Sequence, residues 1–356
     1  MPETSISLEP SGRLINTLAQ TDTQPLKKGG KKQPIFITGK GTDISQNPSL
    51  LKRAKKKLIV QKTILSMIDF ANEHWDFDTA QSYWNTYHCQ GKIQSYQGKL
   101  YGKYCKNRLC PLCCGIRKAD IINRYLPIMQ DWEQPYFVTL TVKAISENRL
   151  KAVIDSMFKG FQKIQRKYKT RHQRCKGFKF VGIKSLECNF NPEKKTYNPH
   201  FHLIVESQKM AETLIEEWLT CSKPNWTNRK AQDARPVNNL EKNLIEIIKY
   251  SSKIFSDPDG KPKKSGSSGS TVYAKALHTI NKAMKNHRIF DRFGFNLPKT
   301  EKVKYGSKSI TEYLEWEFHM TQNDWINSDS DEVLTGYNPP AELIDLLDNK
   351  IDNISF

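Results

Sequence analysis

Two histidines lie one residue apart in the segment YNPHFHLIVE, residues 197–206. The Phe, Leu, Ile and Val around them predict a buried β-strand. Side chains alternate along a strand, so His200 and His202 share one face, about 7 Å apart along the backbone. Two imidazoles on one face can bind a metal ion between them. The alternative is a half-exposed edge strand with two surface histidines.

A third metal ligand is expected from the neighbouring strand. The segment FKFVGIKSLECNF, residues 178–190, predicts this strand, and it places Glu187 across a turn from the histidines. Two imidazoles and one carboxylate leave coordination positions open for water or a phosphate oxygen, which suits a Lewis-acid site. The alternative for Glu187 is a solvated carboxylate.

A second candidate group lies on the predicted helix LIEIIKYSSKIF, residues 244–255. At 100° per residue its apolar side chains share one face, and Glu246, Tyr250 and Lys253 share the opposite face. This column combines a base, a hydroxyl nucleophile and a cation. Tyrosine, with a pKa near 10, needs a nearby cation or metal to act as a phenolate. The alternative is a surface helix with one amphipathic tyrosine.

Four cysteines follow the pattern Cys89-x15-Cys105-x4-Cys110-x2-Cys113. A C-x2-C pair with two further thiols nearby fits a tetrahedral structural zinc site, and buried free cysteines are the alternative. Cys114 and His88 are adjacent, so the exact ligand set stays open. Three cations flank the cysteines, Arg108, Arg117 and Lys118. We expect them to contact the phosphate backbone of a nucleic acid.

The composition favours a polyanionic partner. The 356 residues contain 56 Lys and Arg against 37 Asp and Glu, a net charge of +19. A surface that serves only solubility is the alternative. No run of 18 apolar residues predicts a membrane span, and the N-terminus lacks the features of a signal peptide. Clustered cysteines in such a chain indicate metal binding in the cytoplasm rather than disulfides.

The remaining patterns predict the elements that carry these groups. The segment YFVTLTVK at 136–143 alternates like a strand, and helical spacing occurs in five segments. These are 48–77, 150–169, 207–220, 239–255 and 271–288. Residues 1–46 read as a disordered basic arm. The segment 256–270 predicts a flexible basic loop. Residues 324–356 hold eight acidic residues and one lysine, and they read as an acidic tail.

In this order, YFVTLTVK, the histidine segment and EIIKYSSK resemble the motifs of plasmid rolling-circle replication initiators. These belong to the HUH (His–hydrophobic–His) endonucleases, and CKNRLCPLC is similar to a cysteine segment that precedes the motifs in one initiator family. The resemblance spans about residues 84–294. It implies an α+β fold in which helices flank a central antiparallel sheet, with a zinc-binding segment on the N-terminal side. We therefore expect a helical zinc segment at 47–130 and an HUH nuclease domain at 131–323.

The resemblance implies that His200 and His202 bind Mg²⁺ or Mn²⁺, with Glu187 as their partner. It makes Tyr250 the nucleophile that forms a 5′-phosphotyrosine and leaves a 3′-OH primer. Glu246 then activates water for termination, and Lys253 neutralises phosphate. The expected partners are single-stranded origin DNA of a bacterial plasmid, a host helicase and a DNA polymerase, with no membrane.

Two other functions fit part of the pattern. One is a single-tyrosine HUH transposase or a relaxase, against which the cysteine pattern and the Glu-x-x-x-Tyr spacing both argue. The other is a non-enzymatic, zinc-containing DNA-binding regulator whose histidines are structural. Covalent capture on DNA separates the enzyme from the regulator, because only the enzyme forms an adduct.

Overall fold

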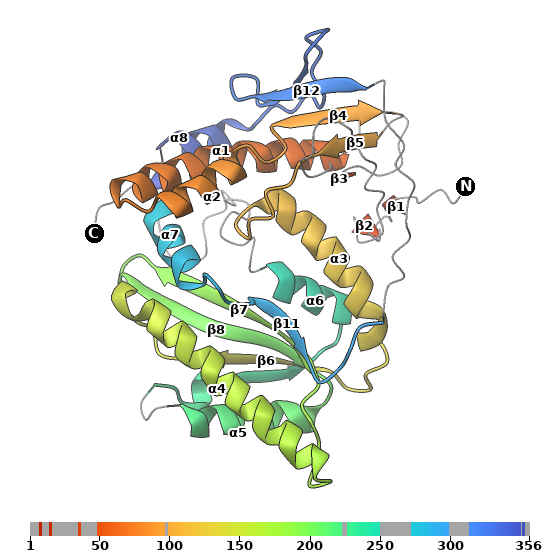
Figure 1. Cartoon of the computed structure of the whole chain (residues 1–356), viewed down its shortest axis with the longest axis vertical. Helices are drawn as coiled ribbons and strands as arrows, with labels where there is room; N and C mark the ends of the chain where they lie inside the picture. The colour runs from red at the N-terminus through yellow and green to blue at the C-terminus, as the bar shows by residue number, and fades with distance from the viewer. Residues whose placement is uncertain are drawn as a thin grey trace. The chain divides into compact units, whose positions relative to one another are not determined.

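The computed structural model describes residues 48–96, 99–222, 226–249, 272–298, 313–349 and 351–352, with three short strands before residue 48. The predicted loop 256–270 and most of the predicted arm lie outside these ranges, as do Tyr250 and Lys253. Two compact units are present (Figure 1). The first comprises Met1–Asn123, Ser252–His278 and Thr300–Phe356, and the second comprises Arg124–Ser251 and Thr279–Lys299. No described helix is long and apolar enough to cross a membrane.

The first unit contains a five-stranded sheet and several helices. Its strands run in the order β13-β12-β4-β5-β3. Their bounds are Asp324–Asn327, Leu314–His319, Lys92–Tyr96, Lys99–Gly102 and Ile35–Phe36. The helices are α1 (Pro48–Glu73), α2 (Phe77–Tyr87), the first part of α3 (Pro111–Met129) and α8 (Ala341–Asn349). Two further pairs of short strands belong to the unit. They are the parallel pair β10–β14 (Val272–Tyr273 and Ile351–Asp352) and the antiparallel pair β1–β2 (Ser7–Leu8 and Leu14–Ile15).

The segment predicted only as an acidic tail contributes to the core of this unit. Trp325 is fully buried, and Leu334 packs in the same apolar cluster as Trp316. Leu343 and Leu347 of α8 pack with residues of α1. The acidic side chains of α8 lie on its exposed face, because an amphipathic helix buries its apolar stripe. Asp324 is itself buried and accepts hydrogen bonds from Thr335.

The second unit is built on an antiparallel sheet in the order β11-β7-β8-β6-β9, as the α+β prediction requires. The bounds are Phe290–Phe293, Gly182–Asn191, Thr196–Val205, Tyr136–Thr141 and Asp233–Pro236. The helices are α4 (Glu147–Gln173), α5 (Gln208–Cys221) and α6 (Leu240–Lys249), with a short η1 (Arg229–Ala231). Helix α7 (Ala274–Ala283) begins in the first unit and ends in the second.

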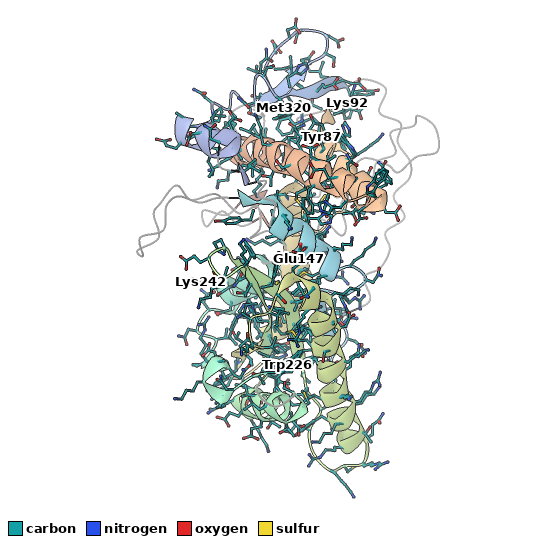
Figure 2. The ribbon with its side chains drawn as sticks, turned by 90° about the vertical axis from the view of Figure 1, so that its left-hand side faces the viewer. Tyr87, Lys92, Glu147, Trp226, Lys242 and Met320 are labelled. Atoms are coloured by element: carbon teal, nitrogen blue, oxygen red, sulfur yellow. The ribbon has the colours of Figure 1, made fainter. Side chains whose placement is uncertain are left out.

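The two faces of this sheet are covered differently. Phe201 of β8 packs edge-on against Phe158 of α4 and Trp218 of α5, so these two helices cover one face (Figure 1). Helix α6 packs against β7 and β8 on the other face (Figure 1). Figure 2 shows α4 with Glu147 at its N-terminal end. Period-2 alternation therefore sends Phe201 into the α4–α5 core and leaves His200 and His202 on the face of α6.

Candidate metal centres

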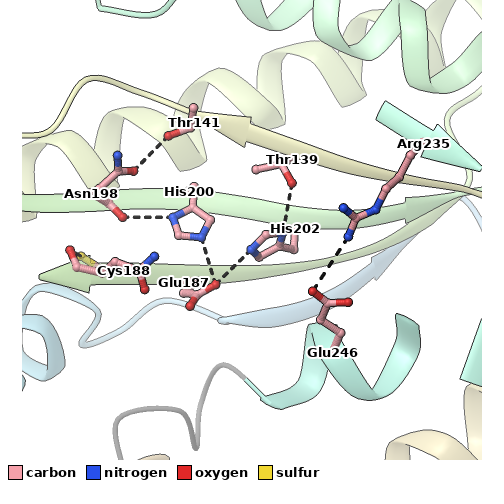
Figure 3. Close-up of polar contacts among 10 residues, drawn as sticks. Thr139, Thr141, Glu187, Cys188, Asn198, His200, His202, Arg235 and Glu246 are labelled. Carbon is pink, nitrogen blue, oxygen red and sulfur yellow. Dashed lines mark hydrogen bonds and ion pairs between the residues drawn. The ribbon is translucent and has the colours of Figure 1, made fainter. Parts of the chain in front are cut away.

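Glu187, His200 and His202 come together on the central strands of the second unit (Figure 3). In the β7–β8 ladder His200 stands directly opposite Glu187, and His202 stands opposite Ser185. Directly opposed residues on one face of an antiparallel pair are close neighbours. The pleat and this register therefore bring the three side chains together, as the sequence predicts. Each is less than a tenth exposed.

One carboxylate oxygen faces both imidazoles. Glu187 Oε2 lies 2.9 Å from His200 Nε2 and 3.0 Å from His202 Nε2. The ring centroids of the two histidines are 4.7 Å apart. Cis ligands of an octahedral ion with bonds of about 2.1 Å are themselves about 3 Å apart. The two distances from Glu187 Oε2 therefore fit neighbouring positions of an octahedral site, and all three donor atoms lie within 4.8 Å of one another.

The neighbouring polar groups set the protonation of the two rings. His200 Nδ1 donates to the backbone carbonyl of Asn198 at 3.0 Å, because a carbonyl oxygen can only accept. A neutral His200 then presents the lone pair of Nε2 to the site, which is the ligand form. His202 Nδ1 lies 3.2 Å from Thr139 Oγ1 on β6 (Figure 3). Burial lowers the pKa of His202, and Glu187 only partly opposes this shift, so the neutral ring is favoured.

Helix α6 brings Glu246 to the same side of the sheet. Leu244 and Ile247 are fully buried, while Glu246 is half-exposed on the opposite face of the helix, as its amphipathic pattern predicts. The negative charge of Glu246 raises the pKa of His202, against the larger lowering by burial. Arg235 of β9 places Nη2 3.9 Å from Glu246 Oε1, and its guanidinium lies 4.8 Å from the centroid of the Phe137 ring (Figure 3).

Four cysteines form a second cluster, in the first unit. Cys89 follows α2, Cys105 follows β5, Cys110 precedes α3, and Cys113 lies in its first turn. The Sγ–Sγ distances from Cys113 are 3.7 Å to Cys89 and 3.5 Å to Cys105. These are far longer than a disulfide bond. They approach the ~3.8 Å edge of a tetrahedron with Zn–S bonds of about 2.3 Å.

The sulfur contacts bias the cysteines in opposite directions. Contacts from Cys110, Cys113 and Cys89 hold the pKa of Cys105 below its usual value, and the contact with Cys105 raises the pKa values of Cys110 and Cys113. The N-terminus of α3 adds a partial positive charge. The buried Lys57 amine donates to the carbonyls of Tyr87 at 2.6 Å and Cys89 at 2.9 Å, although burial lowers its pKa to about 8.

The two neighbours of the cysteine motif lie outside the cluster. Cys114 Sγ contacts the carbonyl of Arg108 at 3.0 Å, and His88 stacks on Trp84. Among the predicted DNA contacts, Arg117 donates to the Lys106 carbonyl at 3.1 Å. Burial and the Arg117 charge lower the pKa of Arg108, and Lys118 is half-buried. Their contact with DNA stays a prediction.

Sequence reasoning missed three residues that support the sites. Thr139 falls in the predicted strand, and its register opposite His202 was the signal that could have found it. Arg235 lies in a four-residue edge strand with no strand pattern, and Lys57 lies in a basic run that reads as a solvated helix face. Tyr250 directly follows Lys249, the last described residue of α6, so the structure does not describe its position.

The chain matches a known protein family over more than half of its length. Residues 98–325 match the family model described as "Replication protein". The chain belongs to this replication protein family. Its motifs place it with the plasmid rolling-circle initiators. The replication protein is 35% identical over 124 residues to a "Protein rep" of Bacillus sp, a match that covers 33% of this chain and 38% of the relative.

Two further relatives have the same name, "Protein rep". The protein from Bacillus amyloliquefaciens is 34% identical over 161 residues, covering 43% of this chain and 44% of the relative. The protein from Staphylococcus aureus is 30% identical over 174 residues, covering 44% of this replication protein and 72% of the relative. The chain spans less than half the length of both Bacillus relatives. No solved structure matches the replication protein.

Proposed function

We propose that this replication protein starts plasmid rolling-circle replication by nicking one strand of single-stranded origin DNA. The observation that carries the proposal is the convergence of Glu187, His200 and His202 on one face of the central strands, with Glu246 on the helix beside them. Three donors on one side of an ion leave the opposite side for a phosphodiester. This arrangement fits an enzyme better than a regulator with structural histidines.

The nicking step uses residues of this chain in named roles. A Mg²⁺ or Mn²⁺ ion bound by Glu187, His200 and His202 would polarise the scissile phosphodiester. The phenol oxygen of Tyr250 attacks phosphorus and loses its proton, the P–O3′ bond breaks, and the leaving O3′ takes up a proton. The products are a 5′-phosphotyrosine and a free 3′-OH, from which a host polymerase extends while a host helicase separates the strands. Lys253 would neutralise charge on the phosphate.

Glu246 takes the role of general base in termination. Its carboxylate is half-exposed, so water can reach it, and it lies four residues before Tyr250 in the sequence. Removing a proton from that water lets its oxygen attack phosphorus in the second cut, which releases the enzyme after one round. Arg235 would hold the carboxylate in place through the ion pair at 3.9 Å.

The test is covalent capture on a labelled single-stranded oligonucleotide that contains the plasmid origin. We expect the wild-type protein to form a denaturant-resistant adduct with Mn²⁺ and none with EDTA. Tyr250→Phe should form no adduct, and its affinity for the oligonucleotide should be unchanged. The matched control is Tyr136→Phe, the same change on β6, which should behave like wild type. An adduct formed by Tyr250→Phe would assign the nucleophile to another residue.

A further inference from the structure

The outer side of helix α4 carries an uncompensated positive charge. Nine exposed Lys and Arg residues lie from Lys159 to Lys179, six on α4 and three after its end at Gln173, and no Asp or Glu occurs from residue 156 to residue 186. Figure 2 shows nitrogen-tipped side chains along the outer side of this helix. Solvated helices usually pair such charges at i, i+4. The first part of α4 does so through Lys151 and Asp155, which lie 3.3 Å apart.

Four of these cations form a row along one side of the helix. Lys159, Lys163, Arg166 and Arg174 fall within about 80° of one another around the helix axis and span roughly 22 Å along it. We call these four residues the basic stripe. The buried residues of α4, such as Phe161 and Tyr168, lie on the opposite side of the helix. In the described part of the chain no ion pair joins the stripe to a carboxylate, whereas Lys167 is paired with Glu217 at 2.6 Å.

We propose that the basic stripe binds the phosphate backbone of double-stranded DNA, on the sheet face opposite Glu187 and the two histidines. The proposal rests on the proposed function, because it concerns the duplex from which the nicked strand comes. A duplex presents one negative charge per about 1.7 Å of its axis, so a rigid 22 Å row of cations meets a matching row of phosphates. Backbone contacts of this kind position a protein without reading sequence.

Two observations favour a duplex over other polyanions. Surfaces that bind single strands stack bases on exposed aromatic rings. Between residues 159 and 179 Phe161 and Tyr168 are buried, and Phe178 packs 5.3 Å from the Phe180 ring. A helix that binds a membrane surface inserts an apolar face. The apolar face of α4 already packs against the sheet through Phe158 and Phe161.

The test compares two triple variants of the full chain. The stripe variant is K159Q/K163Q/R166Q, and the control is K194Q/K230Q/K285Q, which removes the same charge from exposed positions of the same unit. Duplex binding is measured by fluorescence anisotropy between 50 and 300 mM NaCl. Three lost phosphate contacts should reduce the slope of log K against log salt by about 2.7, which weakens binding on the order of 10²-fold at 0.1 M salt. The control should keep at least most of the wild-type slope.

The readouts separate this proposal from the nuclease itself. Cleavage of a short single-stranded origin oligonucleotide with Mn²⁺ should stay at the wild-type level in the stripe variant, because α4 lies on the other face of the sheet. Nicking of the supercoiled plasmid should fall. Equal duplex binding by the two variants would overturn the proposal. So would a loss confined to single-stranded DNA or to anionic vesicles. Should no variant cleave DNA, the duplex-binding comparison still decides the role of the stripe.

Discussion

Replacing Glu187 with Gln tests whether the buried cluster is a metal site or a hydrogen-bonded triad. Glu187 Oε2 lies 2.9 and 3.0 Å from two imidazole nitrogens. The Nδ1–H of neutral His200 donates to the Asn198 carbonyl. Its Nε2 and the Glu187 carboxylate therefore face each other as two acceptors. A cation between the three groups resolves that repulsion. The amide of Gln would resolve it without metal, by donating a hydrogen bond to an imidazole nitrogen.

The two interpretations predict different free energies of unfolding for metal-free protein. If the cluster is a metal site, Glu187→Gln should leave this free energy unchanged or raise it by about 1 kcal/mol, the value of one net hydrogen bond. If a buried imidazolium–carboxylate pair holds the strands together, removing the carboxylate charge should cost about 3–5 kcal/mol. Urea denaturation in EDTA at pH 7.5 measures the difference. A loss of 3 kcal/mol or more would refute the metal interpretation.

Glu187→Gln should also reduce the stabilisation of the protein by Mn²⁺. At a Mn²⁺ concentration of 100 times Kd, the free energy of unfolding of the wild-type protein should rise by about 2.7 kcal/mol. This corresponds to roughly 5–11 °C in Tm for a unit of 150–250 residues. Removing a residue that only hydrogen-bonds to a metal ligand typically lowers metal affinity by about 10- to 100-fold. Because Glu187 would bind the ion directly, we expect Glu187→Gln to lower the affinity for Mn²⁺ by at least ~100-fold. The gain then falls to about 0.4 kcal/mol. Glu216→Gln, the same change on the exposed surface of α5, should respond like wild type.

Three further changes probe other parts of the chain. Cys110→Ser with Cys113→Ser should lose stoichiometric zinc and lower the free energy of unfolding, because a structural zinc contributes folding energy; metal analysis and thermal melting measure both. Burial lowers the pKa of Lys184 from 10.5 to about 8, so stability should rise from pH 8 to 10.5, where only the unfolded chain keeps the proton. Lys184→Met should reduce that rise and increase the free energy of unfolding by about 1–3 kcal/mol at pH 7. Glu246→Ala should nick normally but slow termination by ~10²–10⁴-fold, as scored on a plasmid with tandem origins.

Each change has a control and a contrary result. Cys175→Ser with Cys221→Ser, at exposed positions, should keep zinc, and wild-type protein without zinc would contradict the site. Lys57 has a similar pKa, so part of the rise with pH should persist in Lys184→Met; an unchanged rise would show that Lys184 does not titrate there. Glu216→Ala should terminate normally, and normal yields of the small circle from Glu246→Ala would reject its role as the base.

The sequence predicts the groups of the second unit whose spacing is local. His200 and His202 lie one residue apart on a strand, and their partner Glu187 lies across the hairpin that joins two adjacent strands. Period-2 alternation and a short turn therefore suffice to bring the three together. The same holds for Glu246, because helical spacing alone separates it from the buried Leu244 and Ile247.

The residues that sequence reasoning missed depend on pairing between distant segments. Thr139 reaches His202 only because β6 pairs with β8, 63 residues apart. Arg235 reaches Glu246 because β9 joins the free edge of β6. Lys57 of α1 reaches the Cys89 carbonyl because α1 packs against α2, which precedes Cys89. In the same way Trp325 shows that a charged segment can pack, which composition alone does not reveal.

The number of donors separates the roles of the two metal centres. Four thiols at distances near those of a sulfur tetrahedron provide every ligand that Zn²⁺ takes in a structural site, so no position is left for a substrate. Such a site holds the segments after α2 and β5 to the start of α3. Within the described part of the chain the sheet cluster comprises three residues, Glu187, His200 and His202, and we propose that water and a phosphate oxygen complete the coordination of its ion. We therefore propose that the sheet cluster carries the chemistry and that the cysteine cluster stabilises the fold.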